Sequence, residues 1–228
     1  MANCSIRFWL TLGLFCVLAG PSFAGCNDGP GPGVDWSGCQ KLNRRMAGDD
    51  FRGANLVGAN LTSSDLSGAN LSGANLREAI LLRTQLAGAN LTRADLGKAM
   101  LNRANLRGAD LSAALLVKTE LDRADLADAR LVGSDLQGGE FGRASLINAD
   151  FTGANLQGAY LARADLSNAR FGNADLSNAD LYLARLAGAD LSQVIGLTAP
   201  QLATTCGDDA TKLPQGLAPP TTWPCLAP

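Results

Sequence analysis

Histidine is absent from this chain of 228 residues, and aromatic residues make up only 5% of it. Without histidine the chain lacks the commonest general base and cannot form a Ser–His or Cys–His nucleophile pair. No close pair of cysteines is present to hold zinc. The glycine-rich segment 29–33 does not lie between a strand and a helix, as a phosphate-binding loop requires. These absences predict a protein that is not an enzyme and that uses no cofactor or metal.

Long apolar runs are also scarce, and the one near the start is too short to span a bilayer. Residues 1–24 have the pattern of an export signal peptide: Arg7 is their only positive charge, 8–19 form the apolar run, and Pro21 ends it. Small residues precede the expected cleavage point after Ala24. The prediction is therefore an exported protein, periplasmic or extracellular, with no transmembrane span.

Cysteines remain only at the two ends once this leader is removed. Cys26 and Cys39 lie near the start, and Cys206 and Cys225 near the end. An even number in an oxidising compartment predicts two disulfides, Cys26–Cys39 and Cys206–Cys225. The alternative is a lipoprotein anchored at Cys26, because residues 23–26 form an imperfect lipoprotein cleavage box. Acylating Cys26 would leave an odd number of thiols, which favours the disulfides.

The most informative feature that is present is a five-residue repeat. Every fifth residue from Phe51 to Leu191 is Leu or Phe, at 29 consecutive positions, and a small residue, usually Ala, precedes each by two places from Leu56 on. Steps of five would scatter these side chains around an α-helix and alternate them across a flat strand. A chain that bends once per repeat instead points every one at a common axis. Such units must stack, which predicts a solenoid.

Arginines indicate how many repeats form one coil. Five arginines recur at a spacing of 20 residues, each two places after a repeat Leu or Phe: Arg83, Arg103, Arg123, Arg143 and Arg163. A coil of four pentapeptides would place them in one column, whereas a coil of three would put Lys98 after Arg83. The sequence therefore favours a four-sided coil.

The runs 54–58 (Ala-Asn-Leu-Val-Gly) and 69–73 (Ala-Asn-Leu-Ser-Gly) resemble the pentapeptide repeat family, and the resemblance covers about residues 36–195. It implies an all-β fold, a right-handed quadrilateral parallel β-helix with short capping segments. It also implies that the Leu or Phe and the small residue point inward, with Asp or Asn at or beside the turns. The chain departs from Asp and Asn at Ile80, Gln85, Met100, Leu115, Glu120, Arg130, Glu140, Ser145, Tyr160, Arg170 and Arg185.

Three segments are expected after the leader. Residues 25–50 form an N-terminal cap and a first coil, which should be irregular because Lys41 stands where Leu is expected. Residues 51–195 form the β-helix. Residues 196–228 form a C-terminal cap with a short helix beginning at Thr198 and a disulfide-pinned loop. Both caps would cover the open ends of the stack, which otherwise invite aggregation.

The Arg column is the most specific outward feature. Like charges about 5 Å apart repel, so nearby acids or a bound anion should compensate. One interpretation is a solvated charge lattice with Glu120, Asp122, Asp125, Glu140 and Asp165. The other is an anion-contact stripe for a polyanionic surface. The Asp residues recur with the repeat, so turns explain them better than catalysis does.

The favoured hypothesis is an exported, non-catalytic structural or interaction protein. A rigid rod would present its repetitive polar surface to a macromolecule of the cell envelope, either an envelope protein or an anionic polymer. It is expected to be a monomer or homodimer and to bind no nucleic acid. The resemblance offers an alternative, because quinolone-resistance members mimic DNA and bind DNA gyrase, a topoisomerase. Mimicry needs a strongly negative surface, whereas the chain without its leader has 18 basic against 21 acidic residues.

Overall fold

The computed structural model describes residues 25–221, 223 and 224. The predicted signal peptide, residues 1–24, and the predicted disulfide partner Cys225 lie outside the described residues. Within the described part, no helix has the length and apolar character needed to cross a membrane.

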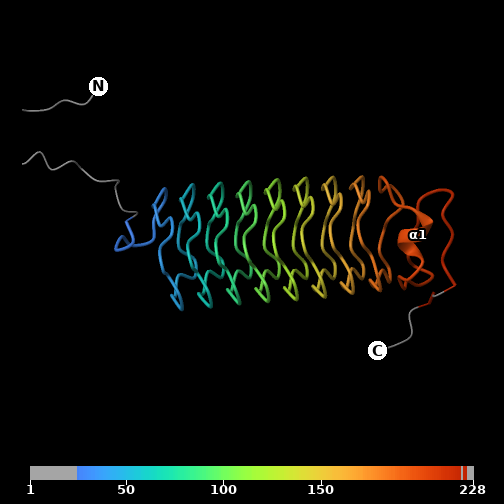
Figure 1. Ribbon diagram of the computed structural model, residues 1–228, viewed down its shortest axis with the longest axis horizontal. Helices are drawn as coiled ribbons and strands as arrows, with labels where there is room; N and C mark the ends of the chain where they lie inside the picture. Colours follow the sequence, from blue (N-terminus) through green and yellow to red (C-terminus); the bar gives the residue numbers. More distant parts are fainter. Residues whose placement is uncertain (1–24, 222, 225–228) are drawn as a thin grey trace, which may run out of the picture.

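The chain winds into a single β-helix whose coils stack along one axis (Figure 1). The residue before each buried Leu or Phe forms a parallel bridge with the residue 20 places later, from Asp35–Asn55 to Asp175–Ile195. A spacing of 20 is four pentapeptides, so the four-sided coil is confirmed. The fold is a right-handed quadrilateral β-helix, as the repeat predicts.

Backbone hydrogen bonds explain why each repeat keeps its polar residue. In the repeat 66–70, the first and third N–H groups donate to carbonyls of the next coil at 2.7 and 2.8 Å. The fourth closes the turn at 3.0 Å, and the fifth donates to the preceding coil at 2.9 Å. The second N–H, that of Ser67, is left over, and the carboxylate of Asp65 accepts it at 3.0 Å. Asp or Asn therefore satisfies the donor that the ladder leaves free.

The core is a column of Leu and Phe side chains. All 29 are at most 1% exposed, and the preceding Ala residues are buried beside them. Where Ser or Thr replaces this Ala, the hydroxyl bonds a carbonyl oxygen; Thr84 Oγ1, for example, donates to Leu61 O at 2.9 Å. Gly139 makes room for a larger ring, because a Cβ there would lie 2.8 Å from Phe141 Cε2. The core thus tolerates exchanges that keep its volume and its hydrogen bonds.

The N-terminal end keeps the same backbone register as the coils that follow. Bridges begin at Asp35, so the irregularity expected around Lys41 is confined to its side chain. Lys41 is 9% exposed, and its Nζ lies 3.7 Å from the centroid of the Trp36 ring. Lysine covers the end of the core here because its stem is apolar and its ammonium faces the indole. Cys26 and Cys39 form a disulfide beside this end, with their Cα atoms 5.5 Å apart.

The C-terminal end is covered by α1, Ala199–Leu202, the short helix that Thr198 was predicted to begin. The Thr198 N–H donates to Gln201 Oε1 at 2.9 Å. Gln201 Nε2 in turn donates to Leu176 O at 2.8 Å and Ala179 O at 3.0 Å. At Ala179 O, a side chain thus takes the place of the backbone N–H that a further coil would have donated.

After α1 the chain rejoins the stack with a shifted register. Cys206 bridges Arg185 and Lys212 bridges Asp190, at spacings of 21 and 22 residues in place of 20. The cap therefore extends the ladder on two sides while its extra residues close the end. This mixture of ladder and loop leaves few strand groups open at the C-terminus.

Candidate functional site

The five arginines, here called the Arg row, occupy the second turn position on one corner of the coil. Each row N–H donates to the carbonyl just before the next row member; that of Arg123, for example, donates to Gly142 O at 2.9 Å. Their backbone φ angles are 56–61°, in the left-handed region that favours glycine. A side chain costs roughly 1–2 kcal/mol in this conformation. The row is therefore held where glycine would be more stable.

Each of the other three corners has glycine at this position in several coils and other residues in the rest. Gly48, Gly68, Gly88 and Gly108, for example, follow one another on a neighbouring corner with φ of 62–75°. On the corner of the Arg row no member from Asn43 to Leu183 is glycine, although every one has positive φ: Asn43, Ser63, the five arginines and Leu183. The requirements of the turn do not explain this corner.

At this corner, the same five coils also lack the Asp or Asn that caps the turn in most repeats. The ladder position three places before each arginine holds Ile80, Met100, Glu120, Glu140 and Tyr160 in place of Asp or Asn. In the flanking coils the turn cap is present: Asn60 Oδ1 accepts the Thr62 N–H at 3.1 Å, and Asp180 Oδ1 accepts the Tyr182 N–H at 2.8 Å. Arginine in place of glycine and the loss of Asp or Asn three places earlier thus occur in the same five coils. Their coincidence distinguishes this side of the rod from the others.

The Arg row has no ion pair within the described residues, and all five arginines are exposed. The acids expected to neutralise it bond elsewhere. Asp165 pairs with Arg185 at 3.6 Å, and Glu120 Oε2 accepts the Asn102 side-chain amide at 3.0 Å. The Arg row thus forms no direct ion pair with the acids of the predicted charge lattice, although Asp122 lies beside Arg103 and Arg123.

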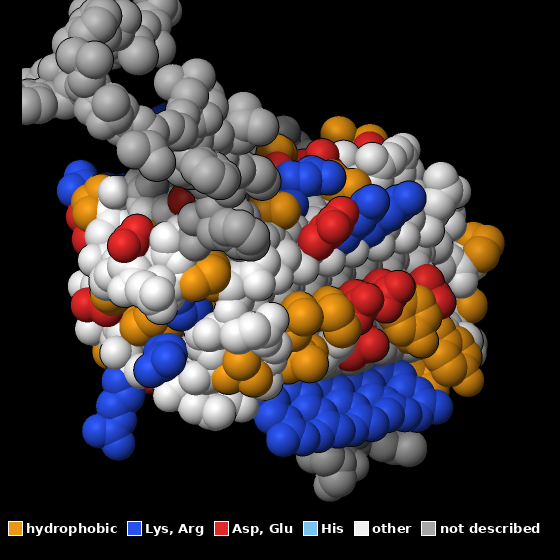
Figure 2. All heavy atoms as spheres, turned by 60° about the vertical axis from the view of Figure 1, so that its left-hand side comes forward, with side chains coloured by type: hydrophobic (Ala, Val, Ile, Leu, Met, Phe, Trp, Pro, Cys, Tyr) orange, Lys and Arg blue, Asp and Glu red, His pale blue; other side chains and the backbone are white. Residues whose placement is uncertain are grey.

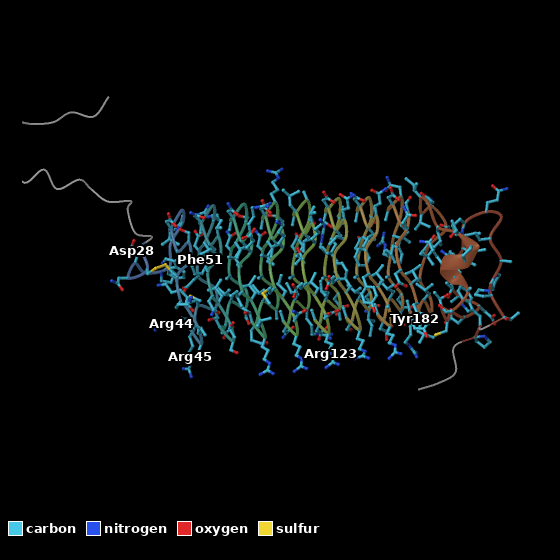
Figure 3. The ribbon with its side chains drawn as sticks, in the orientation of Figure 1. Asp28, Arg44, Arg45, Phe51, Arg123 and Tyr182 are labelled. Atoms are coloured by element: carbon cyan, nitrogen blue, oxygen red, sulfur yellow. A yellow bond between two sulfur atoms is a disulfide. The ribbon has the colours of Figure 1, made fainter. Side chains whose placement is uncertain are left out.

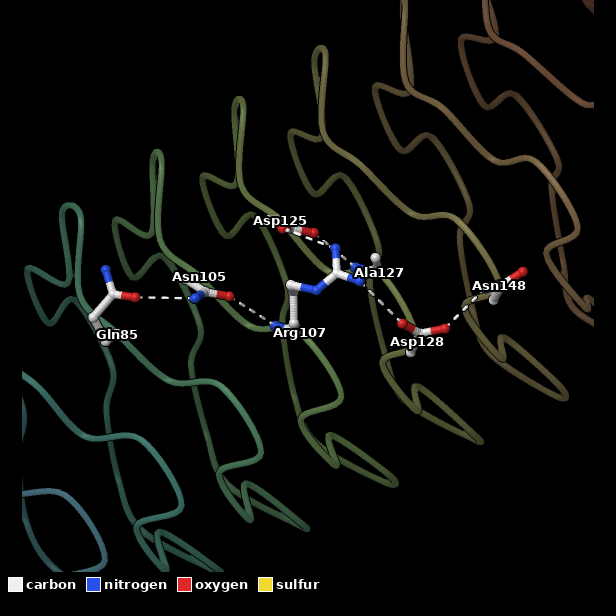
Figure 4. A network of polar contacts seen from close by, with 7 residues as sticks. All are labelled: Gln85, Asn105, Arg107, Asp125, Ala127, Asp128 and Asn148. Carbon is white, nitrogen blue, oxygen red and sulfur yellow. Dashed lines mark hydrogen bonds and ion pairs between the residues drawn. The ribbon is translucent and has the colours of Figure 1, made fainter.

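Asp125 belongs to a different network on the adjoining side (Figure 4). Arg107 pairs with Asp125 and Asp128, both at 3.3 Å, and Asp128 also accepts the Asn148 amide at 2.9 Å. Asp125 Oδ1 additionally accepts the Ala127 N–H at 3.1 Å. Arg107 is thus held by ion pairs on the adjoining side, in contrast to the arginines of the Arg row.

A groove of about 620 Å³ runs beside the Arg row. Buried Gly142 and Ala162 lie in its floor, and Tyr160 and Tyr182, each about half exposed, stand along it. A Cβ at Gly142 would lie 3.0 Å from Tyr160 Cε1, so glycine lets this ring lie close to the backbone. The lining also includes Asn102, Arg103, Asp122, Arg123, Arg143 and Arg163.

The views of the whole molecule agree with this arrangement. Figure 2 shows Lys and Arg side chains gathered in a continuous band along the rod, next to a row of apolar and acidic side chains. In Figure 3, Arg123 and Tyr182 project from the same long edge. Arginine, tyrosine and aspartate side chains thus lie next to one another along this side of the rod.

Chemically, the surface is suited to binding. Guanidinium groups donate forked hydrogen bonds to carboxylates and phosphates, and they stay charged at all physiological pH values. No cluster of potential metal ligands occurs among the described residues. Sequence reasoning identified the Arg row but missed the groove. The coincidence of the Arg row with five successive departures from Asp or Asn, visible in the sequence, would have indicated that this side differs from the others, although not the groove itself.

The fold is a solenoid of stacked pentapeptides with a row of exposed arginines along one corner. The sequence matches the pentapeptide repeats in eight copies, over residues 50–81, 69–108, 79–116, 104–141, 124–161 and 159–195. The chain belongs to the pentapeptide repeat family.

Solved structures show the same fold. HetL from the cyanobacterium Nostoc sp. strain PCC 7120, a pentapeptide repeat protein involved in heterocyst differentiation regulation, is 30% identical with a TM-score of 0.59. The match covers 76% of this chain and 84% of HetL. QnrB1, a plasmid-mediated fluoroquinolone resistance protein, is 16% identical with a TM-score of 0.50, over 76% of this chain and 86% of its own. No curated protein matches the sequence.

Proposed function

We propose that this protein is an exported, non-catalytic interaction rod of the cell envelope. It presents one specialised side to a macromolecular partner. The observation that carries the proposal is the Arg row: five exposed, unpaired arginines in a backbone conformation that favours glycine. Stability alone does not account for them, so binding is the simplest function that does.

The N-terminal end is consistent with an oxidising compartment. Cys26 is bonded to Cys39 in the structure, and a bonded sulfur is not available for acylation. This supports the exported form over the lipoprotein anchored at Cys26. The signal-peptide pattern of residues 1–24 supports the same compartment.

The alternative, a DNA-mimicking topoisomerase-binding protein, is less well supported. Similarity to QnrB1 at 16% identity extends to the fold alone. A DNA mimic needs a continuous negative surface, and a row of unpaired arginines opposes it.

Mass spectrometry of the protein from fractionated native cells tests the proposal. We expect a mature chain that begins at Gly25, in the periplasmic or extracellular fraction, four hydrogens lighter than its reduced form. An acylated Cys26 would instead establish a membrane-tethered lipoprotein. An uncut and fully reduced chain in the cytoplasm would overturn the proposal.

A further inference from the structure

We propose that the Arg row and its groove bind a single chain of a carboxylated polysaccharide lying along the rod. The inference rests on the proposed function and names the class of its partner. It assigns the arginines to the sugar carboxylates, and Tyr160 and Tyr182 to the faces of the sugar rings.

The uniformity of the Arg row points to a polymer with a regular repeat. Successive coils are separated by the strand spacing, about 4.8 Å, so five identical forks recur at equal intervals. All five positions hold Arg, whereas Lys98 and Lys118 occupy the matching turn position on another corner. Arginine binds planar carboxylates in a bidentate manner and lysine does not. An extended chain that carries one carboxylate per sugar ring presents such groups at regular intervals along its length.

The groove also has features that binding of a simple anion would not require. Tyr160 and Tyr182 offer aromatic faces to the apolar C–H side of a sugar ring, and the buried floor at Gly142 and Ala162 allows close approach. Asp122, which also lines the groove, offers its carboxylate oxygens to sugar hydroxyl donors. A carboxylate within an anion-binding site is explained if it accepts hydrogen bonds from hydroxyl groups of the same ligand.

Other anionic macromolecules fit the surface less well. The Arg row is one residue wide, which suits a single extended chain better than the broad face of an anionic membrane. An acidic peptide in extended form presents side chains on one face about every 6.8 Å, which does not match the coil spacing.

The test is isothermal titration of the full mature chain with an oligogalacturonate. Methyl-esterified oligogalacturonate, which has the same sugar rings without the charge, is the matched ligand. The variant Arg103→Gly/Arg123→Gly/Arg143→Gly removes three members of the Arg row at positive φ. The control Arg93→Gly/Lys98→Gly/Lys118→Gly removes the same charge at φ of 55–58° on other corners.

We expect the Arg-row variant to bind about tenfold more weakly or worse, and the control variant to stay within about twofold of the wild type. Glycine favours these turns, so lost binding without lost stability excludes misfolding as the cause. Tyr182→Ala should weaken oligogalacturonate binding and leave binding of inorganic polyphosphate unchanged.

The inference is overturned if the wild type does not bind oligogalacturonate, or if both triple variants weaken equally. It is also overturned if polyphosphate, an oligothymidylate, polyglutamate or phosphatidylglycerol vesicles bind as tightly in the same buffer. Its failure is distinct from that of the proposed function. If the chain is exported and oxidised but does not bind oligogalacturonate, only the proposed ligand is wrong. If it is reduced and cytoplasmic but binds oligogalacturonate, only the proposed compartment is wrong.

Discussion

Within a single turn, the second turn residue meets two opposing demands. The backbone there favours glycine, because a Cβ is poorly tolerated at positive φ. A side chain at this corner, however, projects outward from the rod, as Arg123 does (Figure 3). In the Arg row, five successive coils have arginine at this position despite the conformational cost of positive φ.

Replacing Arg123 by glycine should therefore stabilise the protein. We expect the free energy of unfolding to rise by about 1 kcal/mol, because φ is 58° at this residue and no ion pair is lost. Urea denaturation followed by circular dichroism measures it.

Arg107→Gly provides the control, since it loses the pairs with Asp125 and Asp128 and gains nothing at its own φ. This variant should be destabilised. A loss of stability in Arg123→Gly would mean that the arginine contributes a contact to the folded rod.

In one coil, the Leu column and the polar ladder differ sharply in tolerance. Leu126 is fully buried at the middle of the stack. Leu126→Asp should cost about 4 kcal/mol or more, because it buries a carboxylate without a partner. Urea denaturation of the purified variant tests this.

The neighbouring change Asp125→Ala removes one ion pair and one turn cap at the surface. It should cost only about 1 kcal/mol. Equal destabilisation of the two variants would contradict the assignment of inward and outward positions.

The C-terminal cap should loosen at acidic pH. Hydrogen bonds from Ser192 and from Lys212 lower the pKa of Asp190 below its ordinary 3.8, and the Gly188 N–H and the Thr211 hydroxyl do the same for Asp208. A lowered pKa gives stability that is full above the unfolded value of 3.8 and is lost as the pH falls through the folded value.

Fluorescence of Trp223, which packs against the core and donates to Thr205, reports on this cap. In a Trp36→Phe background, we expect its emission to change as the pH falls from about 5 to 2.5. Asp190→Asn/Asp208→Asn should flatten the change. An unaltered transition in that variant would show that other groups control the cap.

The elements most accurately predicted are those set by local rules. The four-sided coil followed from the spacing of the arginines, and α1 from Thr198 and Gln201. Side-chain partners were less predictable, because they depend on both the coil and the corner. Asp125 lies two residues from Arg123 in sequence, yet it pairs with Arg107. The groove depends on a missing side chain at Gly142, which no periodicity indicates.

For the whole rod, each coil contacts only its neighbours, so stability should vary along the axis. The Cys26–Cys39 bond closes a sequence separation of 13 residues at one end. Cys26→Ser/Cys39→Ser should lower stability by up to about 3 kcal/mol, with the loss concentrated in the first coils.

Hydrogen exchange measures this loss by position. Amides of residues 35–60 should exchange faster in the variant, whereas those of 121–160 should be unchanged. Uniform acceleration along the chain would indicate that the rod unfolds as one cooperative unit.

The 20-residue register also constrains how such a gene can change. Deleting or inserting one pentapeptide between Arg83 and Arg163 would keep every Leu inward, so the rod would still fold. Every later side chain would, however, move by a quarter turn around the axis, and the Arg row would be cut into two shorter rows on different corners. Only changes in multiples of 20 residues lengthen or shorten the rod while leaving its faces intact.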